Sequence, residues 1–211
     1  MAHDLDVSGS APPAGGLPGG QSTARWIVAA VIATLVITGF FVTYGVLNAR
    51  PKTAPPVVSQ VSSVGDLKPG SPAPDFATTG FDGSQVRLSA LKGKAVLVNF
   101  FASWCTECRA EMPAIQAVYR AKHDAGFEVI GVDTWDSGDG KAFYHQVGAT
   151  FPAVFDPQRG QQPGAIARAF GIDTPSLPIS IFIDREGRVH QVFPGGIDAA
   201  IINQQLAQLG V

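Results

Sequence analysis

Two cysteines, the only ones among the 211 residues, stand three positions apart at Cys105 and Cys108. They follow the apolar run 96–101, which predicts a buried parallel strand, and they precede a segment, 107–122, with apolar residues at helical spacing. A sulfur at a helix N-terminus meets unpaired N–H groups and the positive end of the helix dipole, and both favour thiolate over thiol. Cys105 is therefore the predicted nucleophile, and Cys108 can form or resolve a disulfide with it.

A Cys-x-x-Cys pair also occurs in zinc sites and in static disulfides. A structural zinc site normally needs four Cys or His ligands at paired spacings, whereas His123, His145 and His190 are scattered singly, so we predict no metal. A static disulfide that closes so short a loop removes little chain entropy and stabilises weakly. The pair is therefore predicted to perform redox chemistry without a bound cofactor.

The first 65 residues differ in composition from the rest of the chain. Residues 1–24 are rich in Gly, Pro, Ser and Ala, which predicts a disordered tail. Residues 25–48 contain an uncharged, largely apolar stretch, 26–47, which as a helix is about 33 Å long and predicts a transmembrane span. Residues 49–65, rich in Pro, Ser and Val, predict a semi-extended linker.

Two other interpretations of the apolar stretch fit less well. A cleaved signal peptide has a shorter apolar core and a small-x-small cleavage site, which 47–49 matches poorly. A buried core helix has a polar face, and this stretch has none. The flanking charges, Arg25 before it against Arg50 and Lys52 after it, do not support an N-terminus in the cytoplasm.

Residues 66–211 alternate predicted strands and helices and suit one ordinary domain. The predicted strands are 76–79, 85–88, 96–101, 128–133, 151–155, 179–184 and 188–193; the predicted helices are 107–122, 140–148, 163–170 and one that Asp198 caps and that ends at 209. The strand–helix–strand order around the cysteines predicts parallel strands, and turn residues such as Asp82-Gly83 predict hairpins. We therefore predict an α/β fold with a mixed central sheet flanked by helices. The net charge of −2 and the few, dispersed Lys and Arg residues argue against a nucleic-acid partner.

Five short runs in this domain carry a resemblance to a known family. They are Lys92-Gly93-Lys94, Val98-Asn99-Phe100, Trp104-Cys105-Thr106-Glu107-Cys108, Glu111-Met112-Pro113, and Leu177-Pro178 before the strand 179–184. Together they resemble the TlpA/ResA/CcmG-type proteins, which are membrane-anchored bacterial thiol-disulfide oxidoreductases. The resemblance implies a thioredoxin-like fold with an N-terminal hairpin and a central insertion. It also implies a single pass through the bacterial cell membrane, with the catalytic domain outside the cytoplasm.

The resemblance also implies a substrate-binding role for Leu177 and Pro178. A proline that begins a strand needs no functional reason, because that position tolerates the missing N–H group. In thioredoxin-like proteins the proline at this position is cis and faces the two sulfurs. The backbone of Leu177 is then expected to be free to pair with an extended substrate chain.

Glu111 and Trp104 each allow a structural and a functional interpretation. Glu111 is either an ordinary solvated glutamate in the first turns of a helix or, as the resemblance implies, a proton relay beside the sulfurs. Desolvation there would raise its pKa and those of the thiols. Trp104 is either a core aromatic or part of an apolar docking surface next to Cys105, and the resemblance implies the second. Asn99, which cannot titrate, replaces the buried aspartate of thioredoxins proper.

The sequence thus predicts a membrane-tethered thiol-disulfide oxidoreductase that reduces the disulfides of proteins outside the cytoplasm. The resemblance implies apocytochromes c as candidate clients, in cytochrome c maturation, and a membrane thiol carrier as the electron donor. Two alternatives stay open: an oxidase that donates its disulfide to folding proteins, and a binding module with a fixed disulfide. Peroxidase activity is disfavoured because no Pro-x-x-x-Thr-x-x-Cys run leads to Cys105.

Overall fold

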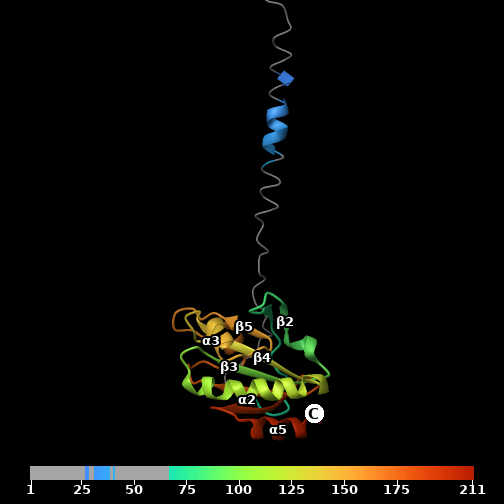
Figure 1. Cartoon of the computed structure of the whole chain (residues 1–211), viewed down its shortest axis with the longest axis vertical. Coiled ribbons are helices and arrows are strands. Elements are labelled where there is room, and N and C mark those ends of the chain that lie inside the picture. The colour runs from blue at the N-terminus through green and yellow to red at the C-terminus, as the bar shows by residue number, and fades with distance from the viewer. Residues whose placement is uncertain (1–26, 29–30, 39, 41–66) are drawn as a thin grey trace, which may run out of the picture. The chain divides into compact units, whose positions relative to one another are not determined.

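The computed structural model describes residues 27–28, 31–38, 40 and 67–211 (Figure 1). The chain divides into two units, Met1–Lys52 and Thr53–Val211. The described residues of the first unit are helical, and Thr38 Oγ1 donates a hydrogen bond to the carbonyl oxygen of Thr34 at 2.7 Å. None of the helices within the described ranges is both long and apolar enough to cross a membrane. Most of the predicted tail, transmembrane span and linker lies outside the described residues.

The second unit is built on a mixed sheet of five strands: β3 (Ala95–Phe101), β4 (Phe127–Thr134), β5 (Ala153–Asp156), β6 (Ile179–Ile183) and β7 (Val189–Pro194). Their order across the sheet is β5-β4-β3-β6-β7. The pairs β3/β4 and β4/β5 are parallel, whereas β3/β6 and β6/β7 are antiparallel. The predicted mixed sheet is thereby confirmed.

Strand β3 occupies the middle of this sheet and is buried along its whole length. Leu97 and Phe101 contribute to one hydrophobic cluster, and Val98 and Phe100 contribute to a second, as alternation along a strand requires. Asn99 falls on the same face as Leu97 and Phe101 and is the one polar residue of the strand. Its amide must therefore find hydrogen-bond partners inside the protein.

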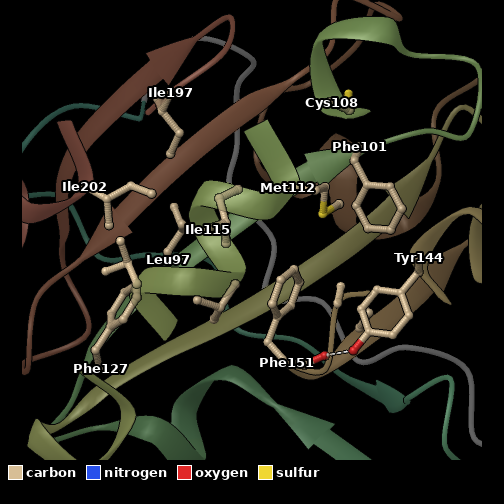
Figure 2. Close-up of a cluster of buried hydrophobic side chains, with 14 of the residues drawn as sticks. Leu97, Phe101, Cys108, Met112, Ile115, Phe127, Tyr144, Phe151, Ile197 and Ile202 are labelled. Atoms are coloured by element: carbon tan, nitrogen blue, oxygen red, sulfur yellow. Dashed lines mark hydrogen bonds between the residues drawn. The ribbon is translucent and has the colours of Figure 1, made fainter. Parts of the chain in front are cut away.

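Helices cover both faces of the sheet. The first cluster takes residues from α2 (Thr106–Lys122), α3 (Gly140–Gln146) and α5 (Ala199–Gln208), and the second takes residues from α4 (Ala165–Ala169). In Figure 2, Met112 and Ile115 of α2 lie among the buried side chains of the first cluster, together with Leu97 of β3 and Ile202 of α5. This packing fixes α2, which carries the cysteines, against the central strand.

The predicted N-terminal hairpin is present as β1 (Ala77–Thr79) and β2 (Gln85–Arg87), which pair antiparallel in a sheet of their own. Two short 3-10 helices, η1 (Leu88–Leu91) and η2 (His123–Ala125), complete the elements. The Phe81 N–H donates to the Ala153 carbonyl at 2.8 Å, so the hairpin loop contacts the edge strand β5. The central insertion is α3, β5 and α4.

Helix α4 begins later than predicted, after Gly164 and not at Pro163. Asp156 of β5 accepts hydrogen bonds from the N–H groups of Ile166 at 3.0 Å and Ala167 at 2.8 Å. Its carboxyl group therefore satisfies the first N–H groups of the helix and sets where the helix starts. A β-carbon at Gly164 would lie 2.2 Å from the Asp156 carboxyl carbon, which explains the glycine there.

Candidate active site

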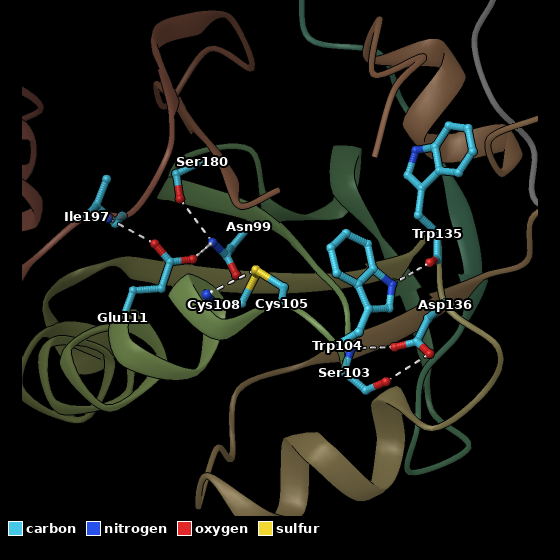
Figure 3. Close-up of a disulfide and its surroundings, with 10 residues drawn as sticks. All are labelled: Asn99, Ser103, Trp104, Cys105, Cys108, Glu111, Trp135, Asp136, Ser180 and Ile197. Carbon is cyan, nitrogen blue, oxygen red and sulfur yellow. Dashed lines mark hydrogen bonds between the residues drawn. A yellow bond between two sulfur atoms is a disulfide. The ribbon is translucent and has the colours of Figure 1, made fainter. Parts of the chain in front are cut away.

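The two cysteines lie where the chain passes from β3 into α2 (Figure 3). Cys105 is the N-cap residue of α2, and its Sγ accepts a hydrogen bond from the backbone N–H of Cys108 at 3.1 Å. The two are joined in a disulfide, so this is the oxidised state. In the reduced protein the same N–H group and the helix dipole favour a thiolate at Cys105. Cys105 is 4% exposed and Cys108 is fully buried, so an incoming partner reaches Cys105 first.

Glu111 is a buried carboxyl group one helical turn beyond Cys108. Its Oε1 accepts a hydrogen bond from Asn99 Nδ2 at 2.8 Å, and its Oε2 accepts one from the Ile197 N–H at 2.9 Å. Burial raises the pKa of Glu111 to about 7, against the lowering effect of these hydrogen bonds and with a small further rise from the Glu107 charge. The interpretation of Glu111 as a solvated glutamate is therefore wrong, and its carboxyl group can exchange a proton near neutral pH.

Asn99 links this carboxyl group to the sheet. Its Nδ2 donates to Ser180 Oγ on β6 at 3.0 Å as well as to Glu111, so both amide protons are used and the orientation of the amide is fixed. Its Oδ1 is buried and has no hydrogen-bond partner among the described residues. In Figure 3 this oxygen points toward the disulfide, where a thiol formed on reduction can donate to it.

The peptide bond between Leu177 and Pro178 is cis, at the entrance to β6. Because Ile179 pairs with Phe100, Pro178 lies at the same end of β3 as the cysteines. The Leu177 N–H, however, donates to the Pro175 carbonyl at 3.1 Å. The expectation of a free Leu177 backbone is thus wrong for its N–H group, which an extended substrate chain can use only by displacing this hydrogen bond.

Trp104 precedes Cys105 and is 52% exposed, so the core interpretation of this residue is wrong. Its indole Nε1 donates to the Trp135 carbonyl oxygen at 2.8 Å. An exposed aromatic side chain held in place next to the reachable sulfur suits the docking of another protein.

Ser180 and Ile197 also belong to this site, although the sequence does not mark them as site residues. Each contacts the Asn99–Glu111 pair from a distant part of the chain. Ser180 lies in the predicted strand 179–184 and Ile197 precedes the predicted cap Asp198, but neither position indicates a contact with Glu111 or Asn99. No group of three or more His, Cys, Asp or Glu side chains that could hold a metal ion occurs within the part of the chain that the structure describes.

Comparison with known proteins assigns the chain to a family. Residues 69–192, more than half of the chain, match the model of the AhpC/TSA family. The chain belongs to the AhpC/TSA family. Among the relatives of this chain, the thiol-disulfide oxidoreductase ResA of Geobacillus thermodenitrificans is 31% identical over 141 residues, which cover 66% of this chain and 77% of that protein. ResA of Bacillus subtilis is 31% identical over 144 residues, or 66% of this chain and 75% of ResA.

A solved structure of similar fold supports the same assignment. The crystal structure of a Chlorobium tepidum protein, described as the thiol:disulfide interchange protein DsbE, has a TM-score of 0.59 and 33% identity. The match covers 68% of this chain and 99% of that one. Together the comparisons confirm the resemblance to TlpA/ResA/CcmG-type proteins, the thioredoxin-like fold and the enzyme class, a thiol-disulfide oxidoreductase. The individual roles of Cys105, Cys108, Glu111, Trp104, Leu177 and Pro178 stay predictions.

Proposed function

We propose that this protein reduces the disulfides of other proteins outside the cytoplasm while tethered to the bacterial cell membrane. The observation that carries the proposal is the buried Glu111 carboxyl group, one turn beyond the fully buried Cys108. Because burial raises its pKa to about 7, Glu111 can take a proton at neutral pH and release it again. A static disulfide needs no such group.

The reaction begins with the Cys105 thiolate, which attacks one sulfur of a client disulfide and displaces the other as a thiolate. Cys108 then gives its proton to Glu111 and attacks Cys105 Sγ. The bond between Cys105 and the client breaks, and the Cys105–Cys108 disulfide present in the structure forms. Two electrons pass to the client, whose two sulfurs take up the Glu111 proton and one proton from solvent.

The direction of electron flow depends on how well the reduced form is stabilised. Burial of Cys108 and the neighbouring Glu111 carboxyl group both disfavour a thiolate, whereas the helix N-terminus favours one at Cys105. We propose that the first two effects prevail, which makes the protein a reductant. Equilibration with a thiol–disulfide buffer should then give a reduction potential of about −270 mV. A value of about −120 mV would indicate the alternative, a disulfide-donating oxidase.

Catalysis is tested by insulin reduction and peroxide consumption with the same full-length protein. The proposal predicts that the wild type reduces insulin and that Cys105→Ser does not. Peroxide consumption without insulin reduction would favour a peroxidase. Activity and partner capture that survive Cys105→Ser would favour a binding module with a fixed disulfide.

The proposed location rests on the apolar stretch 26–47 and on the resemblance to membrane-anchored proteins. Apolar side chains described in this stretch, such as Leu35 and Val36, are exposed in the structure. We expect the protein to remain in membranes after alkaline extraction and a C-terminal alkaline phosphatase fusion to be active. An inactive phosphatase fusion, together with an active C-terminal fusion to a reporter that works only in the cytosol, would contradict this topology.

The proposed clients are apocytochromes c, whose cysteines must be reduced before haem is attached, and the proposed electron donor is a membrane thiol carrier. The support for both is the resemblance to the TlpA/ResA/CcmG-type proteins. Deletion of the protein should then lower the amount of covalently bound haem c in membranes. A small thiol added to the medium should restore it, and failure of that rescue would point away from disulfide reduction.

A further inference from the structure

The loop between β4 and α3 accepts hydrogen bonds from Ser103 and Trp104, the two residues that precede Cys105 in the sequence (Figure 3). Both oxygens of the Asp136 carboxyl group accept hydrogen bonds from Ser103: Oδ1 from its hydroxyl group at 3.0 Å and Oδ2 from its backbone N–H. The carbonyl oxygen of the preceding residue, Trp135, accepts the bond from the Trp104 indole at 2.8 Å. Ser103 and Trp104 thus donate three hydrogen bonds to two consecutive residues of the loop, Trp135 and Asp136.

The backbone of this loop adopts a conformation that its sequence does not favour. Trp135 has a φ of 54°, in the left-handed region, and is the one residue other than glycine with a positive φ within the described part of the chain. That conformation is unfavourable for a bulky side chain and persists only where surrounding contacts impose it. Here it allows the Trp135 carbonyl to face the Trp104 indole while Asp136 faces Ser103.

We propose that Asp136 and Trp135 are positioning residues, which hold the exposed Trp104 indole in a fixed place beside the Cys105 sulfur as a docking face for protein clients. This inference rests on the proposed reduction of protein disulfides. Asp136 accepts hydrogen bonds from Ser103, Asp133 and the Ser137 backbone, and none that the structure records reaches either sulfur. Loss of these bonds should therefore impair the binding of a protein client far more than the chemistry at the sulfurs.

A second carboxyl group, Asp133 at the end of β4, supports Asp136 from behind. It is buried against Gly140 of α3, where a β-carbon would lie 2.0 Å from its Oδ2. Burial, the Asp136 charge, a hydrogen bond to Asp136, and the charges of Asp156 and Asp139 raise the pKa of Asp133 to about 8. Protonated Asp133 can therefore donate to Asp136 at neutral pH and fix its orientation.

Asp136 itself keeps its charge. Burial raises its pKa, but the hydrogen bonds from Ser103, from Asp133 and from the Ser137 backbone outweigh that effect and hold the pKa below its ordinary value. Among the charged groups on neighbouring elements, Arg168 of α4 lowers the pKa of Asp156, which in turn lies close enough to raise that of Asp133. At neutral pH the pair thus carries one proton, on Asp133, and one negative charge, which faces Ser103.

The test compares a protein substrate with a small one, using the full-length protein. Insulin reduction is turned over with dithiothreitol, whereas the small disulfide is reduced in a single turnover by the pre-reduced protein after dithiothreitol has been removed. Asp136→Asn replaces one acceptor oxygen with an amide group and so loses one bond to Ser103. We expect the KM for insulin to rise about tenfold, the loss of roughly one charge-assisted hydrogen bond, with kcat changed less than about twofold. Reduction of the small disulfide 5,5′-dithiobis(2-nitrobenzoate), which needs no docking face, should change less than about twofold. The control is Asp124→Asn, an exposed carboxylate of η2, outside this loop.

Further variants keep the test decisive if Asp136→Asn folds poorly. Ser103→Ala removes only the hydroxyl bond and should raise the KM for insulin by a smaller factor. Trp104→Phe, which removes the indole donor, should also raise this KM, and combining it with Asp136→Asn should add less than the two single effects predict.

The pH dependence of the KM for insulin separates a positioning role of Asp136 from a purely structural one, which would leave this dependence unchanged. The KM of the wild type for insulin should rise as the pH passes about 8, because ionised Asp133 repels Asp136. Asp133→Asn keeps a donor toward Asp136 but cannot ionise, so this rise should disappear. An unchanged KM for insulin in Asp136→Asn, or equal slowing on both substrates, would overturn the inference. A wild type that fails to reduce insulin would overturn the proposed function instead.

Discussion

At the scale of single residues, Asn99 connects the central strand to the chemistry. It lies within β3, and its amide nitrogen is shared between Glu111 of α2 and Ser180 of β6. The residue pattern left the environment of Glu111 open, and only the family resemblance implied the buried carboxyl group that the structure contains. The sequence does not predict that Asn99 Oδ1 has no hydrogen-bond partner among the described residues and faces the disulfide. That orientation depends on the contacts of the amide nitrogen with Glu111 and Ser180, which only the folded structure reveals.

Glu111 should make the stability of the oxidised protein depend on pH. Its pKa is raised from an ordinary 4.5 to about 7 in the folded state, so between these values the folded protein holds a proton that the unfolded chain has lost. The free energy of unfolding should therefore fall as the pH rises from about 4.5 to above 7, by on the order of 3 kcal/mol.

The Glu111→Gln variant has no titrating group at this position, so its free energy of unfolding should not show this decrease with rising pH. Urea denaturation between pH 4.5 and 8 measures the effect as a stability difference between wild type and variant that shifts in favour of the variant with rising pH. Glu186→Gln, at an exposed position in the turn between β6 and β7, is the control. Parallel pH curves for wild type and Glu111→Gln would show that Glu111 is not desolvated as described.

At the scale of elements, α5 completes the site although it carries no reactive group. Asp198 caps this helix: its Oδ1 accepts a hydrogen bond from the Ile201 N–H at 2.8 Å. The residue just before the cap, Ile197, is the one whose N–H bonds to Glu111 Oε2. The start of α5 therefore determines where a hydrogen-bond donor meets the buried carboxyl group.

Removing this cap should affect both stability and the acid group. We expect Asp198→Ala to lower the free energy of unfolding by about 1 kcal/mol. If the Ile197 N–H moves away, the pKa of Glu111 should rise, because that hydrogen bond lowers it. Chemical denaturation and the pH profile of kcat measure the two effects, and Asp198→Asn, which retains a capping oxygen, is the control. Wild-type stability in Asp198→Ala would contradict this assignment of the cap.

The main elements of the sheet could be predicted because their signal is local. Apolar runs mark β3, β4 and β6, and helical spacing marks α2, with only small errors at the ends. The start of α4 could not be predicted, because Asp156 of a neighbouring strand supplies the groups that set it. Likewise, Asp136 gave no signal beyond its place after β4. That place was informative, since the carboxyl ends of the parallel strands β3 and β4 meet at one edge of the sheet.

At the scale of the whole molecule, the domain brings its reactive groups to one end of the central strands. The cysteines follow β3, the loop with Trp135 and Asp136 follows β4, and Pro178 precedes β6. Because β6 is antiparallel to β3, its beginning meets the end of β3. Segments separated by some 70 residues of sequence thus surround one disulfide, and a mixed sheet is what permits this.

The central claim is that Cys105 attacks a client and Cys108 resolves the product, and covalent trapping in membranes tests it most directly. Full-length Cys108→Ser and Cys105→Ser are expressed in cells, free thiols are blocked at acid quench, and adducts are separated without reductant. We expect adducts with other proteins for Cys108→Ser, released by dithiothreitol, and few or none for Cys105→Ser. Equal trapping by both variants, or trapping by Cys105→Ser alone, would contradict it.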